Sequence, residues 1–260
     1  MAKVKDCPGF ETFGADVKEA RKAKNLARKD LAEKVNIDTR YLANIENEGT
    51  IPSLPVIIQL VKICGLPMER YFNHCDNMEL TDGISEHLLR TVMKNAKILM
   101  DEPQCYKARA EVMWAGSLSH NGLMACGNDG GDWACHQLEH ELGGMFDVAH
   151  GAGLAAVWGS WARYVCDALP DRFEQFAVNV MGVENGDDKN AVIQKGIEAM
   201  ENFFRQIEMP TDLGGLNIEV SEDQMKELAL KCSHFGKRTI GCVKKLNQED
   251  IYRIYQKAAD

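Results

Sequence analysis

The sequence predicts an all-α protein, with a small five-helix domain over residues 1–72 and a larger α-helical bundle over residues 73–260. Apolar residues recur at helical spacing along most of the chain, and patterns typical of strands are nearly absent. The helical blocks are short before Phe72 and longer after it. With 260 residues, of which 45% are apolar, the chain is long enough to bury the cores of two modest domains.

Five short helices are predicted in the first part, separated by breaks rich in Asn, Gly and Pro. The breaks fall at residues 24–25, 36–38 and 47–53. The residues that mark the helices are Val17 and Ala20, then Leu31 to Val35, Tyr41 to Ile45, Leu54 to Cys64, and Met68 to Phe72.

Longer helices are predicted after a polar segment that follows Phe72. The first covers residues 84–100, with Thr81 as its expected N-cap. Residues 108–124 are apolar on most faces, which predicts a buried helix. The further predicted helices are residues 133–142, 151–166, 172–181, 188–207, 221–232 and 247–257.

Composition excludes several classes of protein. The nine cysteines contain no C-x-x-C pair, which argues against a disulfide framework and against a thiolate zinc site. The sequence has no apolar run long enough for a membrane span and no secretory signal at its start. We therefore expect a cytoplasmic protein that does not associate with a membrane.

The net charge of −9 is unevenly distributed. Residues 1–72 contain 12 Lys and Arg against 10 Asp and Glu, a balance of +2, whereas residues 73–260 contain 18 against 29, a balance of −11. The acidity therefore belongs to the second part and does not exclude a nucleic-acid partner for the first.

The second and third helices of the first part predict binding to double-stranded DNA. The short turn Asn36–Asp38 is typical of a helix-turn-helix, in which the second of the two helices enters the major groove. Arg and Asn are side chains that recognise base edges, and basic residues at a helix start meet phosphates. The candidate DNA-contacting residues are Arg28, Lys29, Asp38, Thr39, Arg40 and Asn44.

This first part resembles the Xre/Cro-type helix-turn-helix repressors. The resemblance includes LAEKV at 31–35, YLANIEN at 41–47, the PSL that opens the fourth helix, and the pair Arg21 and Glu46, which forms a partly buried salt bridge in that family. Ala27 and Arg28 depart from it, because members usually carry Thr or Ser and then Gln there. A protein–protein contact is the alternative, since the part is only weakly basic; binding to DNA would favour a homodimer.

Three of the seven histidines lie in the stretch HQLEHELGGMFDVAHGAG, at 136–153. His136 and His140 are four residues apart, so on a helix they share one face, and a Gly-Gly pair can turn the chain so that His150 approaches them. Three imidazoles can bind a divalent metal such as iron, zinc or nickel. The alternative is that these are ordinary core or surface histidines.

The second part resembles the C-terminal helical domain of the iron-containing alcohol dehydrogenases, in particular the butanol dehydrogenase group. The motifs are ARAEVMWAGSLSHNGL, GGDWACHQLEHELGGMFDVAHGAGLAAVWGSWARYV, MPTDLGGLNI and TIGCVKKLNQEDIYRIY. The resemblance implies that His136 and His150 are metal ligands and that His140 is a catalytic-site histidine, placed near the active site without being a principal ligand. The positions of the family's other two ligands, an Asp and a His, fall on Lys62 and Leu66.

That departure predicts an incomplete site for iron or zinc. The family's nicotinamide cofactor is held largely by a Rossmann-type domain that precedes the helical domain, and this sequence shows a helix-turn-helix pattern there instead. No nicotinamide cofactor is therefore expected. The run GAGLAA at 151–156 matches a dinucleotide fingerprint only formally, because no strand is predicted before it.

Other residues near the histidines carry weaker expectations. Glu139 and Glu141 are expected to point to other helix faces than His140, and Asp132 is a candidate metal carboxylate. A helical domain that lacks its family's α/β neighbour is also expected to expose an apolar face. Candidates for that face, unless they are core residues, are Trp114, Trp133, Met145 and Phe146.

Three functions follow from these patterns. The first is a sequence-specific DNA-binding, transcriptional-regulator-like protein with an inactive dehydrogenase-like domain. The alternative is an iron-dependent NAD(P)H alcohol dehydrogenase, or a fragment of one. A third, compatible function is assembly, in which the helical domain dimerises the DNA-binding part. Both resemblances include MERYF at 68–72, which suggests a joining of two reading frames at that stretch.

Overall fold

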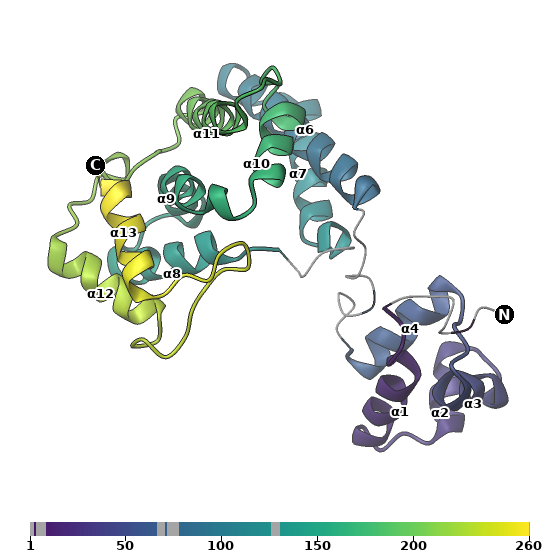
Figure 1. The fold of residues 1–260 in the computed structure, drawn as a ribbon. Helices are drawn as coiled ribbons and strands as arrows, with labels where there is room; N and C mark the ends of the chain where they lie inside the picture. The colour runs from purple at the N-terminus through teal and green to yellow at the C-terminus, as the bar shows by residue number, and fades with distance from the viewer. Residues whose placement is uncertain (1–2, 4–8, 67–70, 72–77, 126–130, 260) are drawn as a thin grey trace. The chain divides into compact units, whose positions relative to one another are not determined.

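The structure is a computed structural model that describes residue 3 and residues 9–66, 71, 78–125 and 131–259. The chain divides into two compact units, one of Met1–Thr81 with Gly122–Gly130 and one of Asp82–Asn121 with Gly131–Asp260. Both are helical (Figure 1). Within the described ranges the only extended pairings are two isolated bridges, so the predicted all-α class is confirmed.

The first unit contains four described helices: α1 (Phe13–Ala23), α2 (Arg28–Val35), α3 (Thr39–Glu48) and α4 (Leu54–Cys64). Their apolar faces meet in one core, whose fully buried members include Phe13, Leu31, Leu42, Ile45 and Leu60. Burial of these side chains is the main stabilising contribution to the unit. The predicted fifth helix at 68–72 lies outside the described residues apart from Tyr71, which packs edge-on against Phe13.

Three residues in left-handed backbone conformation end α2, α3 and α4. Asn36, Gly49 and Gly65 have φ angles of 54°, 61° and 70°, at the C-caps where such conformations commonly stop a helix. Asn36 thereby turns the chain between α2 and α3. α1 approaches α3 closely because Gly14 has no side chain: a Cβ there would lie 2.1 Å from the carbonyl oxygen of Ile45.

A buried ion pair links α1, α2 and α3. Glu46 accepts hydrogen bonds from Arg21 Nε at 2.6 Å and from Arg28 Nε at 2.9 Å, and its side chain is fully buried. Burial raises the pKa of the Glu46 carboxyl, but the hydrogen bonds and charges of the two arginines outweigh it and leave the pKa below its ordinary value. The pair predicted from the resemblance is therefore present, with Arg28 as a third member.

The second unit is built around four helices. They are α8 (Ala134–Phe146), α9 (His150–Val165), α12 (Glu222–Cys232) and α13 (Gln248–Ala259), and they bury a core that includes Leu138, Val157, Leu228, Ile254 and Tyr255. Around them lie α6 (Glu79–Asp101), α7 (Tyr106–Ser119), α10 (Pro170–Gln175), the π-helical turn Phe176–Val180 and α11 (Lys189–Gln206). None of the described helices is long and apolar enough to cross a membrane.

Two predictions about α6 and α7 are wrong. Thr81 lies inside α6, which already begins at Glu79, so it is not the N-cap. The helix at 106–119 is not buried: Tyr106, Met113 and Trp114 are 82%, 74% and 63% exposed. Helical spacing cannot show whether an apolar face has a neighbour to cover it, and in the described part of the chain this face has none.

Replacing Glu46 by Gln should destabilise the first unit by about 3 kcal/mol, because Arg21 would remain buried without its counter-ion. In the wild type, the stabilisation by the Glu46 carboxylate should be fully present at pH values above the pKa of this carboxyl in the unfolded chain. It should be lost as the pH falls through the lower pKa that the carboxyl has in the folded protein. Hydrogen exchange of α1–α4 amides between pH 3 and pH 7 measures the loss of stability in the variant and the pH dependence of stability in the wild type. All four Trp residues, at 114, 133, 158 and 161, lie in the second unit and report its integrity by fluorescence.

The matched control is Glu48→Gln, an exposed position on the same helix. Equal protection in the two variants would contradict a stabilising role for the buried pair.

Candidate functional site

The start of α3 is fixed by Asp38. Its Oδ1 accepts hydrogen bonds from the backbone N–H groups of Arg40 at 2.7 Å and Tyr41 at 3.3 Å, as an N-cap side chain does. This capping occupies one oxygen of a residue that we expected to contact DNA. The cap also defines where α3 begins, so it places the residues of the first turn.

The first turn of α3 presents its polar side chains to solvent. Thr39 and Arg40 are exposed and Asn44 is half-buried, while Lys29 is exposed on α2. Within the described residues, neither Lys29 nor Arg40 forms an ion pair. Both cations are therefore available to phosphates or to base edges.

Arg28 does not share this freedom. Its guanidinium is bound to Glu46 through Nε and through a second nitrogen, also at 2.9 Å, and its side chain is 34% exposed. The residue expected to meet a phosphate thus holds α2 against α3. The sequence pointed to Arg21 and Glu46, but it gave no signal for this third partner except the unusual Arg at that position.

The three histidines come together where α8 and α9 meet. His136 and His140 lie one turn apart on α8 with ring centroids 6.5 Å apart, and His150, the first residue of α9, lies 5.4 and 5.6 Å from them. The chain turns between the helices at Asp147, which has a φ of 54°. The prediction that Gly143 and Gly144 turn the chain is wrong, because both lie inside α8. The predicted convergence of the imidazoles is present in the structure.

Glu139 belongs to this cluster, contrary to our expectation. Its Oε2 is hydrogen-bonded to Nδ1 of His150, and the residue is only 2% exposed. The spacing of residues along α8 alone places Glu139 off the face of His140. His150 instead approaches it from α9. A carboxylate on one ring nitrogen orients an imidazole so that its other nitrogen faces a ligand.

Two glycines make room for the buried carboxylate. A Cβ on Gly153 would lie 2.7 Å from Glu139 Cγ, and a Cβ on Gly143 would lie 3.2 Å from Glu139 Oε1. These glycines therefore serve helix packing. The GAGLAA run lies inside α9, where it forms no phosphate-binding loop.

A fourth histidine, His120, influences the cluster. Burial lowers the pKa of His136, and the charges of His150, His140 and His120 lower it further. A neutral imidazole is the form that binds metals. His120 lies next to the C-terminal end of α7, and only its place in the motif SLSHNGL could have drawn attention to it.

Part of the cluster fits a divalent cation. One ligand atom each from Glu139, His140 and His150 lie within 4.8 Å of one another, and imidazole nitrogen with carboxylate oxygen suits iron or zinc. Asp132 is not available, because Oδ2 accepts from the backbone N–H groups of Cys242 and Val243 at 2.7 and 2.8 Å.

The two positions to which the resemblance assigns the family's Asp and His ligands lie in the first unit. Lys62 is exposed at the end of α4, and Leu66 packs against the core of that unit. An ammonium group and an aliphatic side chain cannot bind a cation. The metal-binding groups that we identify are therefore those on α8 and α9.

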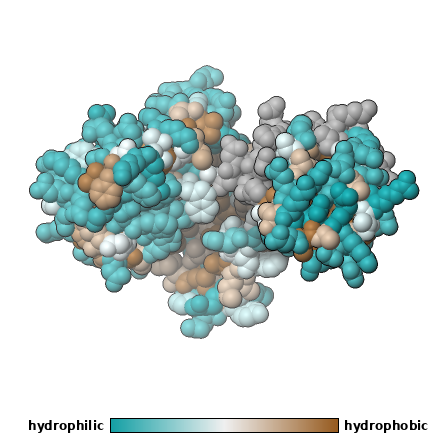
Figure 2. Space-filling model, turned by 90° about the horizontal axis from the view of Figure 1, so that it is seen from below, coloured by the Kyte–Doolittle hydropathy of each residue, from teal (hydrophilic) through white to brown (hydrophobic). Residues whose placement is uncertain are grey.

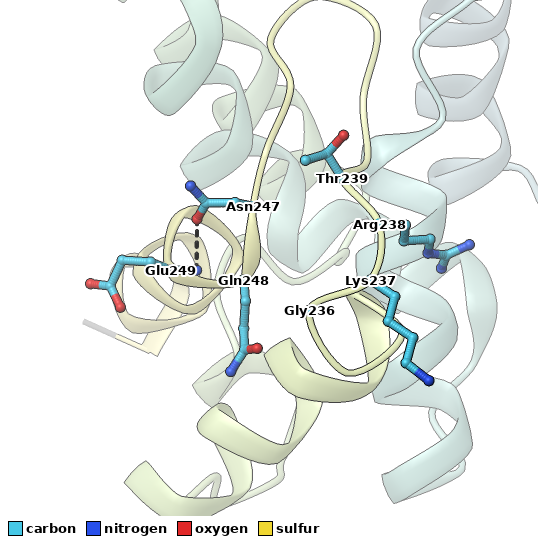
Figure 3. Close-up of a pocket in the computed structure, with 7 residues that line it drawn as sticks. All are labelled: Gly236, Lys237, Arg238, Thr239, Asn247, Gln248 and Glu249. Atoms are coloured by element: carbon cyan, nitrogen blue, oxygen red, sulfur yellow. Dashed lines mark hydrogen bonds between the residues drawn. The ribbon is translucent and has the colours of Figure 1, made fainter.

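Two of the pockets lined by described residues lie in the second unit. One, of about 290 Å³, is lined by Trp133, His136, Gln137, His140, Glu141 and Arg238. The other, of about 740 Å³, is lined by residues 236–239 and 247–249 (Figure 3). In the second, Asn247 Oδ1 already accepts from the N–H groups of Glu249 and Asp250, so the start of α13 is capped by the chain itself.

The expected apolar face is only partly present. Trp114 and Trp133 are 63% and 55% exposed, whereas Met145 and Phe146 pack against the core of the second unit. Apolar patches interrupt a largely hydrophilic surface in Figure 2.

Comparison with known proteins supports both parts of the sequence analysis. Residues 17–70 match the Helix-turn-helix family model, and residues 67–259 match that of the Fe-containing alcohol dehydrogenase family, C-terminal. NADH-dependent butanol dehydrogenase A of Clostridium acetobutylicum is 31% identical over 210 residues, which are 80% of this chain and 53% of that protein. The chain thus spans about half the length of the curated relatives it matches.

Solved structures agree. The crystal structure of NADH-dependent butanol dehydrogenase A from Thermotoga maritima superposes with a TM-score of 0.65 and 34% identity, over 70% of this chain and 46% of that one. The structure of the aldehyde reductase YqhD from E. coli superposes with a TM-score of 0.65 and 29% identity, over 73% of this chain and 49% of that one. Both predicted resemblances are confirmed.

Glu139→Gln should lower the affinity of the cluster for Zn²⁺ or Fe²⁺ by about 10–100-fold, because a neutral amide orients and polarises the His150 imidazole less well. Titration of chelator-treated protein with each metal, followed by elemental analysis, measures the change. His136→Ala and His150→Ala should each lower the affinity for the metal further than Glu139→Gln does. Glu198→Gln, an exposed change on α11, is the control. Unchanged metal content in all three histidine-cluster variants would contradict a metal site here.

Proposed function

The chain belongs to the Fe-containing alcohol dehydrogenase family through residues 67–259, and from this premise we propose that it is a cytoplasmic, sequence-specific DNA-binding regulator that uses its dehydrogenase-like domain for assembly and metal binding. The observation that carries the proposal is the exposed first turn of α3, held in place by the buried pair of Arg21 and Glu46. We place the division between the domains at residues 72 and 73.

Recognition would use α3 in the major groove. Arg40 would bind guanine O6 and N7, and Asn44 would bind adenine N6 and N7, as the geometry of these side chains allows. Lys29 would neutralise a phosphate. Arg28 would contribute chiefly by fixing α2 against α3, because Glu46 already binds its guanidinium.

A homodimer fits this function. One weakly basic domain makes few phosphate contacts, and two copies place two recognition helices one helical turn of DNA apart. The exposed apolar side chains of α7, Met113 and Trp114, offer surface for such assembly. A strict monomer at micromolar concentration would contradict this part of the proposal.

Metal binding would use His136 and His150 as ligands, with His140 beside them and Glu139 as the group that orients His150. A bound iron or zinc ion would supply a Lewis acid there. The residues themselves join the start of α9 to the middle of α8, so a cation would stiffen the contact between these helices. No reaction step is assigned to the site.

A second candidate function is alcohol or aldehyde oxidoreduction. Family membership and the convergence of the histidines support it. Against it stand Lys62 and Leu66 at two of the family's ligand positions and the packing of Gly153 against Glu139. Hydride transfer needs a nicotinamide held against the reacting carbon, and the described residues contain no glycine-rich loop that would hold its phosphates.

Arg40→Ala and Asn44→Ala should each cost about 1–3 kcal/mol of binding to an operator selected from random DNA, and should relax the preference at one base position. Lys29→Ala should weaken binding to all DNA sequences by a similar factor. It should also reduce the slope of log affinity against log salt concentration by about one. Fluorescence anisotropy at several salt concentrations measures both effects. Lys195→Ala, an exposed lysine on α11, is the charge-matched control. Failure to select any sequence would contradict the proposal.

Under the same proposal, protein loaded with Fe²⁺ or Zn²⁺ should not oxidise NADH or NADPH in the presence of butanal above the rate of a His136→Ala, His150→Ala double variant. The physical reason is that, among the described residues, we identify no group that positions a nicotinamide against the cluster. Absorbance at the reduced-nicotinamide band measures the rate. Turnover that is lost in the double variant would establish the second candidate function instead.

A further inference from the structure

The pocket that contains His136 and His140 is lined by one acidic and one basic side chain. It is lined by six residues, Trp133, His136, Gln137, His140, Glu141 and Arg238, and has a volume of about 290 Å³. Five of these residues belong to α8 or directly precede it, and Arg238 comes from the loop after α12. Pockets of this size are at the lower end of those that enclose small organic ligands.

Arg238 and Glu141 bring opposite charges to this pocket. Arg238 is anchored by its Nε, which donates to the carbonyl oxygen of Cys232 at 3.0 Å, so its position does not depend on Glu141. In the part of the chain that the structure describes, neither side chain forms an ion pair. The terminal nitrogens of Arg238 and the carboxylate of Glu141 are thus available to a ligand.

Gln137 adds an unsatisfied acceptor. Its Oε1 is buried and has no hydrogen-bond partner in the structure. A buried acceptor without a donor is destabilising. Because that oxygen has almost no accessible surface, the group of the pocket that calls for a positively charged donor is the Glu141 carboxylate.

An apolar wall completes the pocket. The indole of Trp133 is 55% exposed and packs edge-on against His136, with ring centroids 4.7 Å apart. Aromatic surface of this kind favours an apolar or aromatic group on the ligand.

We propose that this pocket binds a free α-amino acid with an apolar or aromatic side chain. The ligand carboxylate lies on Arg238, its ammonium group on Glu141, and its side chain against Trp133. A simple anion would meet the Glu141 carboxylate, and a simple cation would meet the Arg238 guanidinium, so a ligand with both charges fits best. The binding stands independently of the proposed regulation of DNA; its use as an effector site rests on that function.

The test is isothermal titration of the full chain, treated with chelator, with L-phenylalanine and L-leucine. We expect a dissociation constant below about 1 mM for at least one of them. 3-Phenylpropionate, which lacks the ammonium group, and 2-phenylethylamine, which lacks the carboxylate, should each bind at least about tenfold more weakly. No heat for either amino acid, or equal affinity for an analogue that lacks one charge, would overturn the proposal.

Variants locate the site. Glu141→Gln and Arg238→Gln should each weaken binding of the amino acid at least about tenfold. Glu227→Gln, an exposed change on α12 where the carboxylate pairs only with Lys231, should leave it unchanged. Glu141→Gln preserves side-chain shape, so it tests the site even if Arg238→Gln unfolds the loop.

Metal provides the last control. Binding that appears only after addition of Zn²⁺ would show that the amino acid is held by a cation on the histidines, and would overturn the assignment to Arg238 and Glu141. A failed titration leaves the DNA-binding proposal intact, because operator binding is measured without any amino acid.

Discussion

The helix-turn-helix depends on one buried carboxylate. Glu46 has two arginine partners from two other helices, so α1, α2 and α3 are tied to the same charge. Packing of apolar side chains would allow α3 to slide along the core, because hydrophobic contacts are not directional. Hydrogen bonds to a fixed carboxylate do not allow it. The first turn of α3 is therefore presented at one angle, which readout of base edges requires.

The second unit uses the same device. Glu139 is buried between α8 and α9, and Gly143 and Gly153 leave the space that its side chain occupies. It is hydrogen-bonded to the imidazole of His150. The pocket beside the cluster differs, because its charges have no partners among the described side chains. A satisfied buried carboxylate fixes structure, whereas Glu141 and Arg238 remain available for a ligand. Satisfaction by protein partners thus separates structural from ligand-binding charges in this chain.

Local sequence signals predicted the fold and much of the site. Helical spacing located α2, α3, α8 and α9, because each of these helices buries one face. The Asn and Gly breaks also located the ends of α2 and α3, which stop at left-handed residues, whereas the predicted Gly143–Gly144 break lies inside α8. Spacing could not show that α7 is exposed, since burial depends on a neighbour. It also could not show that Glu139 contacts His150 or that Arg28 binds Glu46, because each contact joins two helices.

Metal binding and hydride transfer make different demands on the same cluster. A cation needs only neutral imidazoles at suitable spacing, which α8 and α9 provide, and the lowered pKa of His136 favours that form. Hydride transfer also needs a second bound molecule at fixed distance. Under the proposed function, the chain keeps a cation-responsive contact between two helices without turnover. An effector changes DNA affinity only when it binds one arrangement of the protein better than another. The α8–α9 contact is the described element where such a difference would arise, because the cluster and the adjoining pocket share His136 and His140.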